Sequence, residues 1–243
     1  MKEKTISVII PLRNEALYLV KLLDMLHRQP IDQIILVDGG SRDRSPALLQ
    51  TWARNSNACK HRIAMDAPPG RATQMNAGAK EATGDILLFL HADTQLPPDG
   101  IARVLQTMKN KNIFGGAFRL QIDSKHPFML WVCWLANLRS FYWGLPYGDQ
   151  AIFVRRAIFE KLGGYPALPL MEDVAFVRKL KKTGRMLLLK EAVTTSARRW
   201  QQQGYFLNSF KNMLILLFYF CGVSPQGLAA WYYPKKSVQQ SKK

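Results

Sequence analysis

Two aspartates stand close behind short apolar runs in the amino-terminal half of the chain. Asp38 follows residues 34–37, and Asp93 follows residues 85–90 by way of His91 and Ala92. Carboxylates at the ends of neighbouring parallel strands can accept hydrogen bonds from a ligand, or hold a hard cation together with a diphosphate. An aspartate in such a position can equally serve only to cap the next turn or helix. Both interpretations stay open for each residue.

A second acidic pair, Glu172 and Asp173, opens a segment with helical periodicity. One carboxylate there could remove a proton from an attacking hydroxyl group. Acids in the first turn of a helix are also favoured by the helix dipole alone, so simple capping is the alternative.

The apolar patterning predicts the elements that position these residues. Residues 7–15 and 34–43 each contain an apolar run that ends in polar, turn-forming residues, and leucines at helical spacing lie between them. This unit indicates two parallel strands joined by a right-handed crossover, and in such sheets ligands bind beyond the strand ends. We expect an α/β fold with a mostly parallel central sheet flanked by helices. Further strands are predicted at 62–65, 85–90, 115–122 and 148–154, and helices at 70–79, 97–110 and 170–180.

The carboxyl-terminal part is basic and aromatic. The formal net charge is +17, and residues 178–243 contain thirteen Lys or Arg but one acid, Glu191. Such a block favours an anionic partner: a membrane surface, nucleic acid or a phosphorylated substrate. Residues 205–223 are largely apolar, but their uninterrupted core at 213–221 is much shorter than the roughly 20 residues of a spanning helix. An interfacial helix is one interpretation, and a helix that covers the core or a dimer interface is the other.

Composition narrows the class of protein. With 243 residues and 48% hydrophobic content the chain can bury a full core. The three cysteines, Cys59, Cys133 and Cys221, argue against a disulfide framework or a cysteine zinc site. The amino terminus does not have the pattern of a secretory signal, so we expect a cytoplasmic protein, peripheral on the inner face of the membrane if the basic tail meets lipid. No helix-turn-helix or aromatic-studded sheet motif is evident, and nucleic acid is not the expected partner.

The order of motifs adds a family resemblance. VIIPLRNE, VDGGSRD, GRATQMNAGA, LLFLHAD, YGDQAIFVRR and MEDVAF occur in this order, and the chain resembles glycosyltransferase family 2, with its GT-A nucleotide-binding fold, over about residues 6–200. GRATQMN with HADTQLP is similar to the radical-SAM/selenodomain-associated transferase 2 subfamily. The resemblance implies a catalytic domain at 1–200, followed by a hydrophobic helix and basic tail at 201–243.

The resemblance also implies an inverting glycosyl transfer from a nucleotide-diphosphate sugar to a hydroxyl acceptor. UDP is the expected nucleotide, and a lipid-linked molecule is a candidate acceptor. A divalent metal, Mn²⁺ or Mg²⁺, would be held by Asp93. His91 replaces the first aspartate of the family's DxD motif, which leaves the metal preference open, and a buried hydrogen-bonding role for His91 is the favoured reading. The implied nucleotide-sugar contacts are Pro11, Arg13, Glu15, Asp38, Arg71, Gln74, Asn76, Ala92 and Asp93.

On the acceptor side the resemblance implies Asp173 as the general base, with Glu172 and Asp149 as alternatives. The acceptor contacts would be Gly148, Asp149, Gln150 and Trp200, and Arg71 or Arg198 would help to neutralise the diphosphate. The QxxRW element lacks its glutamine here, which favours transfer of single residues. The competing functions are a nucleotide-sugar-binding protein without activity, a basic nucleic-acid-binding module, and a nucleotidyltransferase, whose usual glycine-rich loop is missing.

Overall fold

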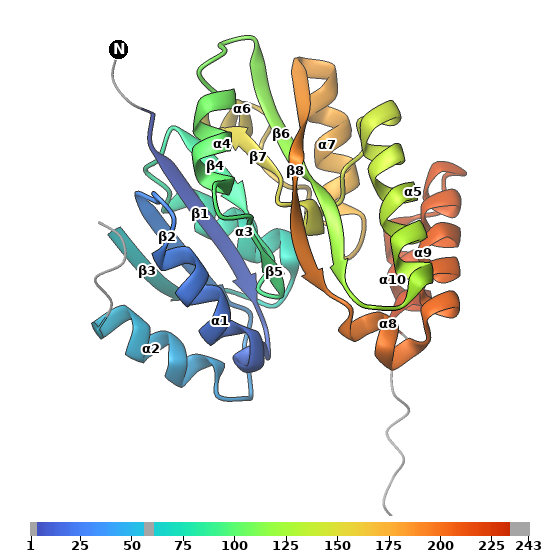
Figure 1. The fold of residues 1–243 in the computed structure, drawn as a ribbon, viewed down its shortest axis with the longest axis horizontal. Coiled ribbons are helices and arrows are strands. Elements are labelled where there is room, and N and C mark those ends of the chain that lie inside the picture. The colour runs from blue at the N-terminus through green and yellow to red at the C-terminus, as the bar shows by residue number, and fades with distance from the viewer. Residues whose placement is uncertain (1–3, 56–60, 234–243) are drawn as a thin grey trace, which may run out of the picture.

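The computed structural model describes residues 4–55 and 61–233, so Cys59 lies outside the described residues. A single eight-stranded sheet runs through the molecule in the order β3-β2-β1-β4-β7-β6-β8-β5, with helices on both faces (Figure 1). The strands are β1 (Ile6–Leu12), β2 (Gln33–Asp38), β3 (His61–Asp66), β4 (Ile86–Phe89), β5 (Thr94–Gln95), β6 (Ile113–Asp123), β7 (Phe153–Arg155) and β8 (Arg185–Ser196).

The first four strands form the parallel half that the apolar runs predict. β1 pairs in parallel with both β2 and β4, and β2 pairs in parallel with β3. β1, β2 and β4 are buried along their whole length, because helices cover both faces of this half. The other half is mixed, since β7 runs antiparallel to β4 and β6 whereas β6 and β8 are parallel. The ends of β1, β2 and β4 therefore meet at one edge of the sheet.

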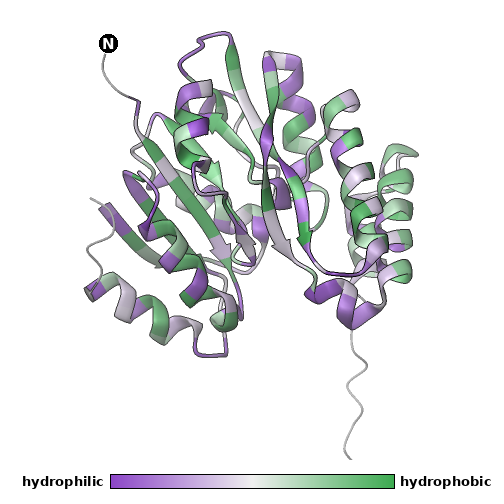
Figure 2. Cartoon of the chain, viewed as in Figure 1, coloured by the Kyte–Doolittle hydropathy of each residue, from purple (hydrophilic) through white to green (hydrophobic). Residues whose placement is uncertain are grey.

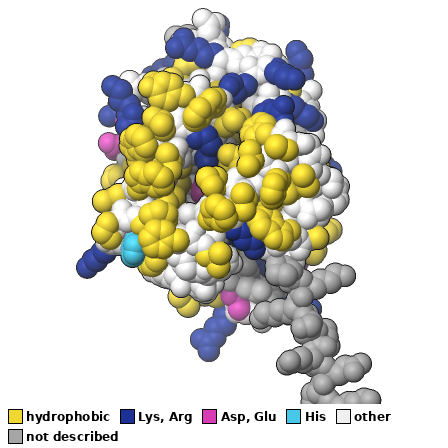
Figure 3. All heavy atoms as spheres, turned by 90° about the vertical axis from the view of Figure 1, so that its right-hand side faces the viewer, with side chains coloured by type: hydrophobic (Ala, Val, Ile, Leu, Met, Phe, Trp, Pro, Cys, Tyr) yellow, Lys and Arg dark blue, Asp and Glu magenta, His cyan; other side chains and the backbone are white. Residues whose placement is uncertain are grey.

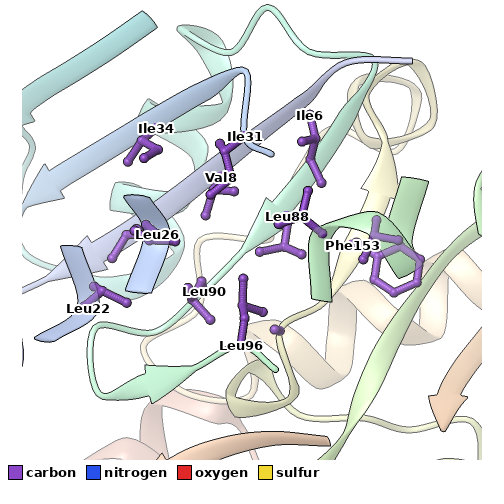
Figure 4. Close-up of a cluster of buried hydrophobic side chains, with 14 of the residues drawn as sticks. Ile6, Val8, Leu22, Leu26, Ile31, Ile34, Leu88, Leu90, Leu96 and Phe153 are labelled. Carbon is purple, nitrogen blue, oxygen red and sulfur yellow. The ribbon is translucent and has the colours of Figure 1, made fainter. Parts of the chain in front are cut away.

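Two hydrophobic layers hold the helices to this sheet. On one face, α1 (Ala16–His27), α2 (Ser45–Asn55) and α4 (Gly100–Thr107) pack on side chains such as Val8 and Leu88 (Figure 4). On the other face lie α3 (Arg71–Lys80), α6 (Arg156–Lys161) and α7 (Glu172–Thr183). Gly78 of α3 comes so close to β1 that an added Cβ would lie 2.6 Å from a methyl group of Ile9. The small residues of α3 thus allow tight packing against the strands.

The remaining helices gather at one end of the molecule. They are α5 (Pro127–Trp143), α8 (Arg198–Gln203), α9 (Tyr205–Phe220) and α10 (Pro225–Tyr232). Figure 2 shows that α5 and α9 are largely hydrophobic although they lie at the right-hand edge of the fold. Within residues 4–55 and 61–233, none of the helices has both the length and the apolar character needed to cross a bilayer.

One predicted strand is wrong over half of its length. Residues Gly148–Gln150 form a single 3-10 turn, and the strand begins only at Phe153. The Gln150 side chain points inward from this turn: its Nε2 donates to the distant Phe118 carbonyl at 2.9 Å, and its Oε1 accepts the N–H of Tyr147 at 3.1 Å. Ala151 then adopts a left-handed conformation with φ of 48°, which breaks the extended run.

Candidate active site

The sheet edge opens onto a cleft of about 720 Å³. A smaller cavity of about 150 Å³ adjoins it on the side of α7, α8 and α9. The two share several lining residues, and these mark the place where the clefts meet. The shared residues are Arg71, His91, Asp93, Leu170, Glu172, Arg199 and Tyr233. Two adjoining cavities with a common charged wall can hold two reactants side by side.

Most of the predicted nucleotide contacts lie around the larger cleft. Its lining includes Pro11, Arg13, Glu15, Arg71, Gln74, Ala92 and Asp93. Asp38 and Asn76 are not among the lining residues. The resemblance therefore selects a set of residues that the fold largely brings to one place.

Asp38 stands where its strand ends, but its carboxylate is engaged in the following turn. It accepts hydrogen bonds from the Ser41 hydroxyl at 2.5 Å and from the Ser41 N–H at 3.1 Å. The side chain is buried. This is the turn-capping arrangement, and it holds the loop after β2 in place.

Gln74 and Asn76 make structural hydrogen bonds. The amide Nε2 of Gln74 donates to the carbonyls of Leu12 and Val37, each at 2.8 Å, and so ties the ends of β1 and β2 together. Asn76 bonds both the N–H and the carbonyl of Tyr165, at 2.9 and 2.8 Å. The Asn76 amide thus holds the loop between α6 and α7, and a nucleotide contact of Asn76 stays a prediction.

The common wall of the clefts carries an ion pair whose acid is buried. Arg71 Nη1 lies 3.4 Å from Glu172 Oε1, and the Glu172 side chain is only 4% exposed. Burial disfavours the charged form of Arg71, but the acidic groups around it, first Glu172 and then Tyr233, Asp173 and Asp149, together outweigh the burial and raise the pKa of Arg71. Burial also raises the pKa of Glu172, and the positive charge of Arg71 opposes this rise. Glu172 is thereby bound to a cation, which makes it a poor candidate for the base.

Arg198, a predicted diphosphate contact, lies in neither cleft. Its Nη2 bonds both carboxylate oxygens of Glu15, at 2.7 and 2.9 Å. A diphosphate contact of Arg198 stays a prediction, whereas its neighbour Arg199 lines both clefts. The Arg199-Trp200 dipeptide, which matches the last two letters of QxxRW, is the signal that could have identified it.

His91 lines both clefts with a neutral ring. Burial, together with Arg71 and Arg199, lowers the pKa of His91 well below its ordinary value. Its Nε2 is buried and has no hydrogen-bond partner. A Cβ added at Gly148 would lie 2.9 Å from that nitrogen, so the glycine allows the acceptor-side loop to approach closely. Over the described residues, no three or more His, Cys, Asp or Glu side chains are grouped so that they could hold a metal ion.

Two aspartates line only the smaller cavity. Asp173, in the first turn of α7, is oriented by two backbone N–H groups: Gly148 donates to Oδ2 and Val174 to Oδ1, both at 2.7 Å. Asp149 leaves its buried Oδ1 without a partner. Burial raises the pKa of Asp149 to about 6; Arg139 opposes this rise, and the charges of Asp173 and Asp93 add to it. A carboxylate titrating near neutral pH is suited to proton transfer.

Of the other predicted acceptor contacts, one lines the smaller cavity and one is buried away from it. Trp200 lines the smaller cavity, and its indole N–H donates to Ser209 at 3.0 Å. Gln150 is fully buried and its amide is occupied, since Nε2 donates to the Phe118 carbonyl at 2.9 Å and Oε1 accepts from Ser140 at 2.8 Å. Gln150 thus supports the turn from inside, and its contact with a sugar stays a prediction.

Among the residues of this cavity that lie outside the motifs, Asn208 has a buried amide without partners. Asn208 of α9 is 1% exposed, lines the smaller cavity, and neither its Oδ1 nor its Nδ2 has a hydrogen-bond partner. A buried amide without partners is costly, so it calls for an explanation. It offers one donor and one acceptor to a polar group in the cavity. The only signal in the sequence is a polar residue within an apolar helix.

Comparison with known proteins assigns the family. The sequence profile of Glycosyl transferase family 2 matches residues 7–163. The chain belongs to glycosyltransferase family 2. Among curated relatives, an undecaprenyl-phosphate 4-deoxy-4-formamido-L-arabinose transferase of Pseudomonas aeruginosa is 34% identical over 106 residues, which cover 42% of this chain and 31% of that protein. The transferase of the same description from Pseudomonas fluorescens is 32% identical over 139 residues, 55% of this chain and 40% of that protein. The chain thus matches less than half the length of these relatives.

Solved structures of other proteins share the fold of this chain. A mannosyltransferase of Pyrobaculum calidifontis in complex with GDP-Man and Mn²⁺ superposes with a TM-score of 0.64 at 20% identity, covering 80% of this chain and 57% of the other. S. aureus TarS 1-349 in complex with UDP-GlcNAc gives 0.64 at 18% identity, covering 79% and 58%. The predicted α/β, GT-A type fold is confirmed, with a sheet that is mixed beyond β4.

Proposed function

We propose that this chain transfers a glycosyl group from a nucleotide-diphosphate sugar to a hydroxyl group of an acceptor. The observation that carries the proposal is the pair of adjoining cavities. They share a wall of charged residues, and only the smaller one contains Asp149 and Asp173. A donor in the larger cleft would place its diphosphate at the shared wall, and an acceptor in the smaller cavity would meet it there.

The larger cleft has the size and charge for the donor. Its volume of about 720 Å³ suits a ligand larger than a simple sugar. Arg13, Arg71 and Arg199 line it, and guanidinium groups bind phosphate oxygens in pairs. We propose a UDP-linked donor, in keeping with the motif resemblance and with the UDP-GlcNAc named for one structural neighbour.

A divalent cation fits this site only if the diphosphate of the donor supplies some of its ligands. Asp93 lines both clefts and would supply one oxygen ligand for Mn²⁺ or Mg²⁺; diphosphate oxygens and water would have to complete the set. His91 offers a neutral, unpartnered ring nitrogen on the same wall, a ligand type that Mn²⁺ accepts more readily than Mg²⁺. When bound, the cation would neutralise charge on the departing diphosphate.

Asp173 is the proposed general base. In an inverting transfer the acceptor oxygen attacks the anomeric carbon as the bond from that carbon to the diphosphate oxygen breaks, and the diphosphate departs with the bonding electrons. The hydroxyl proton passes to the carboxylate of Asp173, which the N–H groups of Gly148 and Val174 hold in one orientation. Asp149 is the second candidate, since its Oδ1 is free and its pKa of about 6 matches the task.

The acceptor is proposed to be lipid-linked, and the enzyme to work in the cytoplasm at the inner face of the membrane. The names of the curated relatives, which are undecaprenyl-phosphate transferases, support this. They give no support to the radical-SAM/selenodomain-associated subfamily, which stays a prediction. We also keep the division into residues 1–200 and 201–243 as a proposal, with the addition that Asn208 and Tyr232 of the second part line the acceptor cavity.

Calorimetric titration of the purified protein with UDP, GDP and CDP tests the proposal. Each nucleotide is added with Mn²⁺, with Mg²⁺ and with a chelator. Tighter binding of one diphosphate in the presence of metal is the expected result, and it names the donor class. No binding under any condition would refute the donor site and favour an inactive or nucleic-acid-binding protein.

A further inference from the structure

One side of the molecule exposes large hydrophobic side chains on three helices. Figure 3 shows them gathered over the end formed by α5, α9 and α10. We call this the helical face; it consists of Leu130, Trp131, Trp134, Leu135, Phe141, Tyr142 and Trp143 on α5, Phe206, Leu207, Phe210, Met213, Leu217, Phe218 and Phe220 on α9, and Trp231 on α10. Monomeric soluble proteins rarely expose a contiguous apolar patch of this kind without a partner for it.

The exposed side chains follow the helical repeat. On α9 they recur at Phe206, Phe210, Met213, Leu217 and Phe220, each three or four residues apart. On the other side of the same helix, Asn208 and Ile215 are buried. A helix that packs on a core and faces water carries polar residues on its outer side. The outer side of α9 is instead apolar, which fits a helix that faces a second apolar medium.

Cations border this face, whereas acids are absent from its helices. The sequences of α5, α9 and α10 contain no Asp or Glu. Arg178 lies 5.3 Å over the ring of Phe220, Lys211 lies 5.7 Å over that of Trp231, and Lys181 donates to the carbonyl of Trp143. Aromatic rings mixed with basic residues are typical of the headgroup region of a bilayer, and Lys or Arg near an anionic lipid surface adds to binding.

The helical face adjoins the acceptor cavity. Asn208, Asn212 and Ile215 of α9 and Tyr232 of α10 line that cavity, so one helix presents residues to the cavity and to the face. A surface bound through α9 would therefore lie next to the smaller cavity, in which the acceptor is proposed to bind.

We propose that the helical face docks on the headgroup region of a bilayer that contains anionic phospholipids. The proposal rests on the proposed function only for the statement that the acceptor is reached from that bilayer. The apolar stripes of α5 and α9 insert their aromatic ends among the headgroups, and the bordering cations contact lipid phosphates. The molecule lies on the membrane and does not need to cross it.

Co-sedimentation with vesicles tests this, using the full chain and vesicles of phosphatidylcholine with and without phosphatidylglycerol. The face variant carries Trp131→Ser and Phe210→Ser, which are 56% and 54% exposed and line neither cleft. The matched control carries Leu17→Ser and Val20→Ser, which are 87% and 61% exposed on α1. We expect binding to the anionic vesicles, a loss of about tenfold or more in the face variant, and no change in the control.

Failure to bind anionic vesicles, or equal binding by the face variant and the control, overturns the proposal. A second outcome also overturns it: the natural chain is a dimer by light scattering, the face variant is a monomer, and neither binds vesicles. The helical face would then contact a second copy of the chain. Circular dichroism and UDP titration of the same proteins separate the two proposals. Vesicle binding without nucleotide binding would leave the docking face standing and refute the donor site; nucleotide binding without vesicle binding would do the reverse.

Discussion

Replacing Asp149 with Asn should make the protein more stable at neutral pH. The carboxylate of Asp149 has a buried Oδ1 without a hydrogen-bond partner, and burial raises the pKa of this group to about 6 from a model-peptide value of 3.8. In the folded protein the charged form is thus disfavoured. The difference of about 2 pKa units corresponds to about 3 kcal/mol, as an upper limit, because each unit is worth about 1.4 kcal/mol.

The sign of the pH dependence follows from proton uptake. Between about pH 4 and pH 6 the folded state holds a proton on Asp149 that the unfolded state has lost, so stability falls as the pH rises through this range. The penalty is complete above about pH 6 and absent below about pH 4. Asparagine carries no charge at any pH. The variant should therefore exceed the natural protein in stability by up to about 3 kcal/mol at pH 7, and the gap should close toward pH 4.

Urea unfolding of both proteins across this pH range measures the gap. Asp123→Asn is the matched control, because that aspartate is exposed at the end of β6 and should show no such trend. Equal stability of the Asp149 variant and the natural protein at pH 7 would refute the reasoning. A gap that widens as the pH falls would refute it as well, because the sign would be reversed.

Four further outcomes are expected. Asp173→Asn should abolish transfer and leave UDP affinity unchanged by calorimetry, whereas unchanged turnover would remove Asp173 as the base. Asp93→Ala should weaken UDP binding with Mn²⁺ present but not with chelator; equal affinity in both would remove it as a metal ligand. Gln74→Leu should cost about 1–3 kcal/mol in urea unfolding, because two buried hydrogen bonds to strand-end carbonyls are lost, although the Leu12 carbonyl keeps the N–H of Gly39. Asn208→Leu should raise stability by about 1–3 kcal/mol, since an unpartnered buried amide is removed, and should lower transfer; a destabilised variant would contradict the cost assigned to the amide, and unchanged transfer would contradict the proposed acceptor contact.

The sequence predicted most of the parallel half of the sheet. The apolar runs at β1 to β4 and the leucine spacing of α1 are local patterns, and each element forms where its own residues favour it. The 3-10 turn at Gly148–Gln150 was missed because its cause is not local. Gln150 reaches the carbonyl of Phe118 on β6, and that distant partner turns the segment inward.

Which polar side chains face the clefts was decided by the tertiary structure. The motif order identified Arg71, Asp93 and Asp173, and family membership follows from the chain itself. Spacing could not separate Asn76, which bonds a loop 89 residues away, from residues that line the larger cleft. It could not place Asn208 in the smaller cavity either, because helix α9 reaches that cavity only once the sheet and α7 are in place.

By itself, then, the sequence determined the elements of the parallel half, the family and the chemistry that the strand ends can supply. Local patterns of apolar and turn-forming residues carry that information, because they act over a few residues at a time. The tertiary structure decided which of the predicted site residues make hydrogen bonds inside the protein. It also decided that α5 and α9 leave an aromatic side exposed. Both depend on partners far apart in the chain, and a buried polar group takes whichever partner the fold brings within reach.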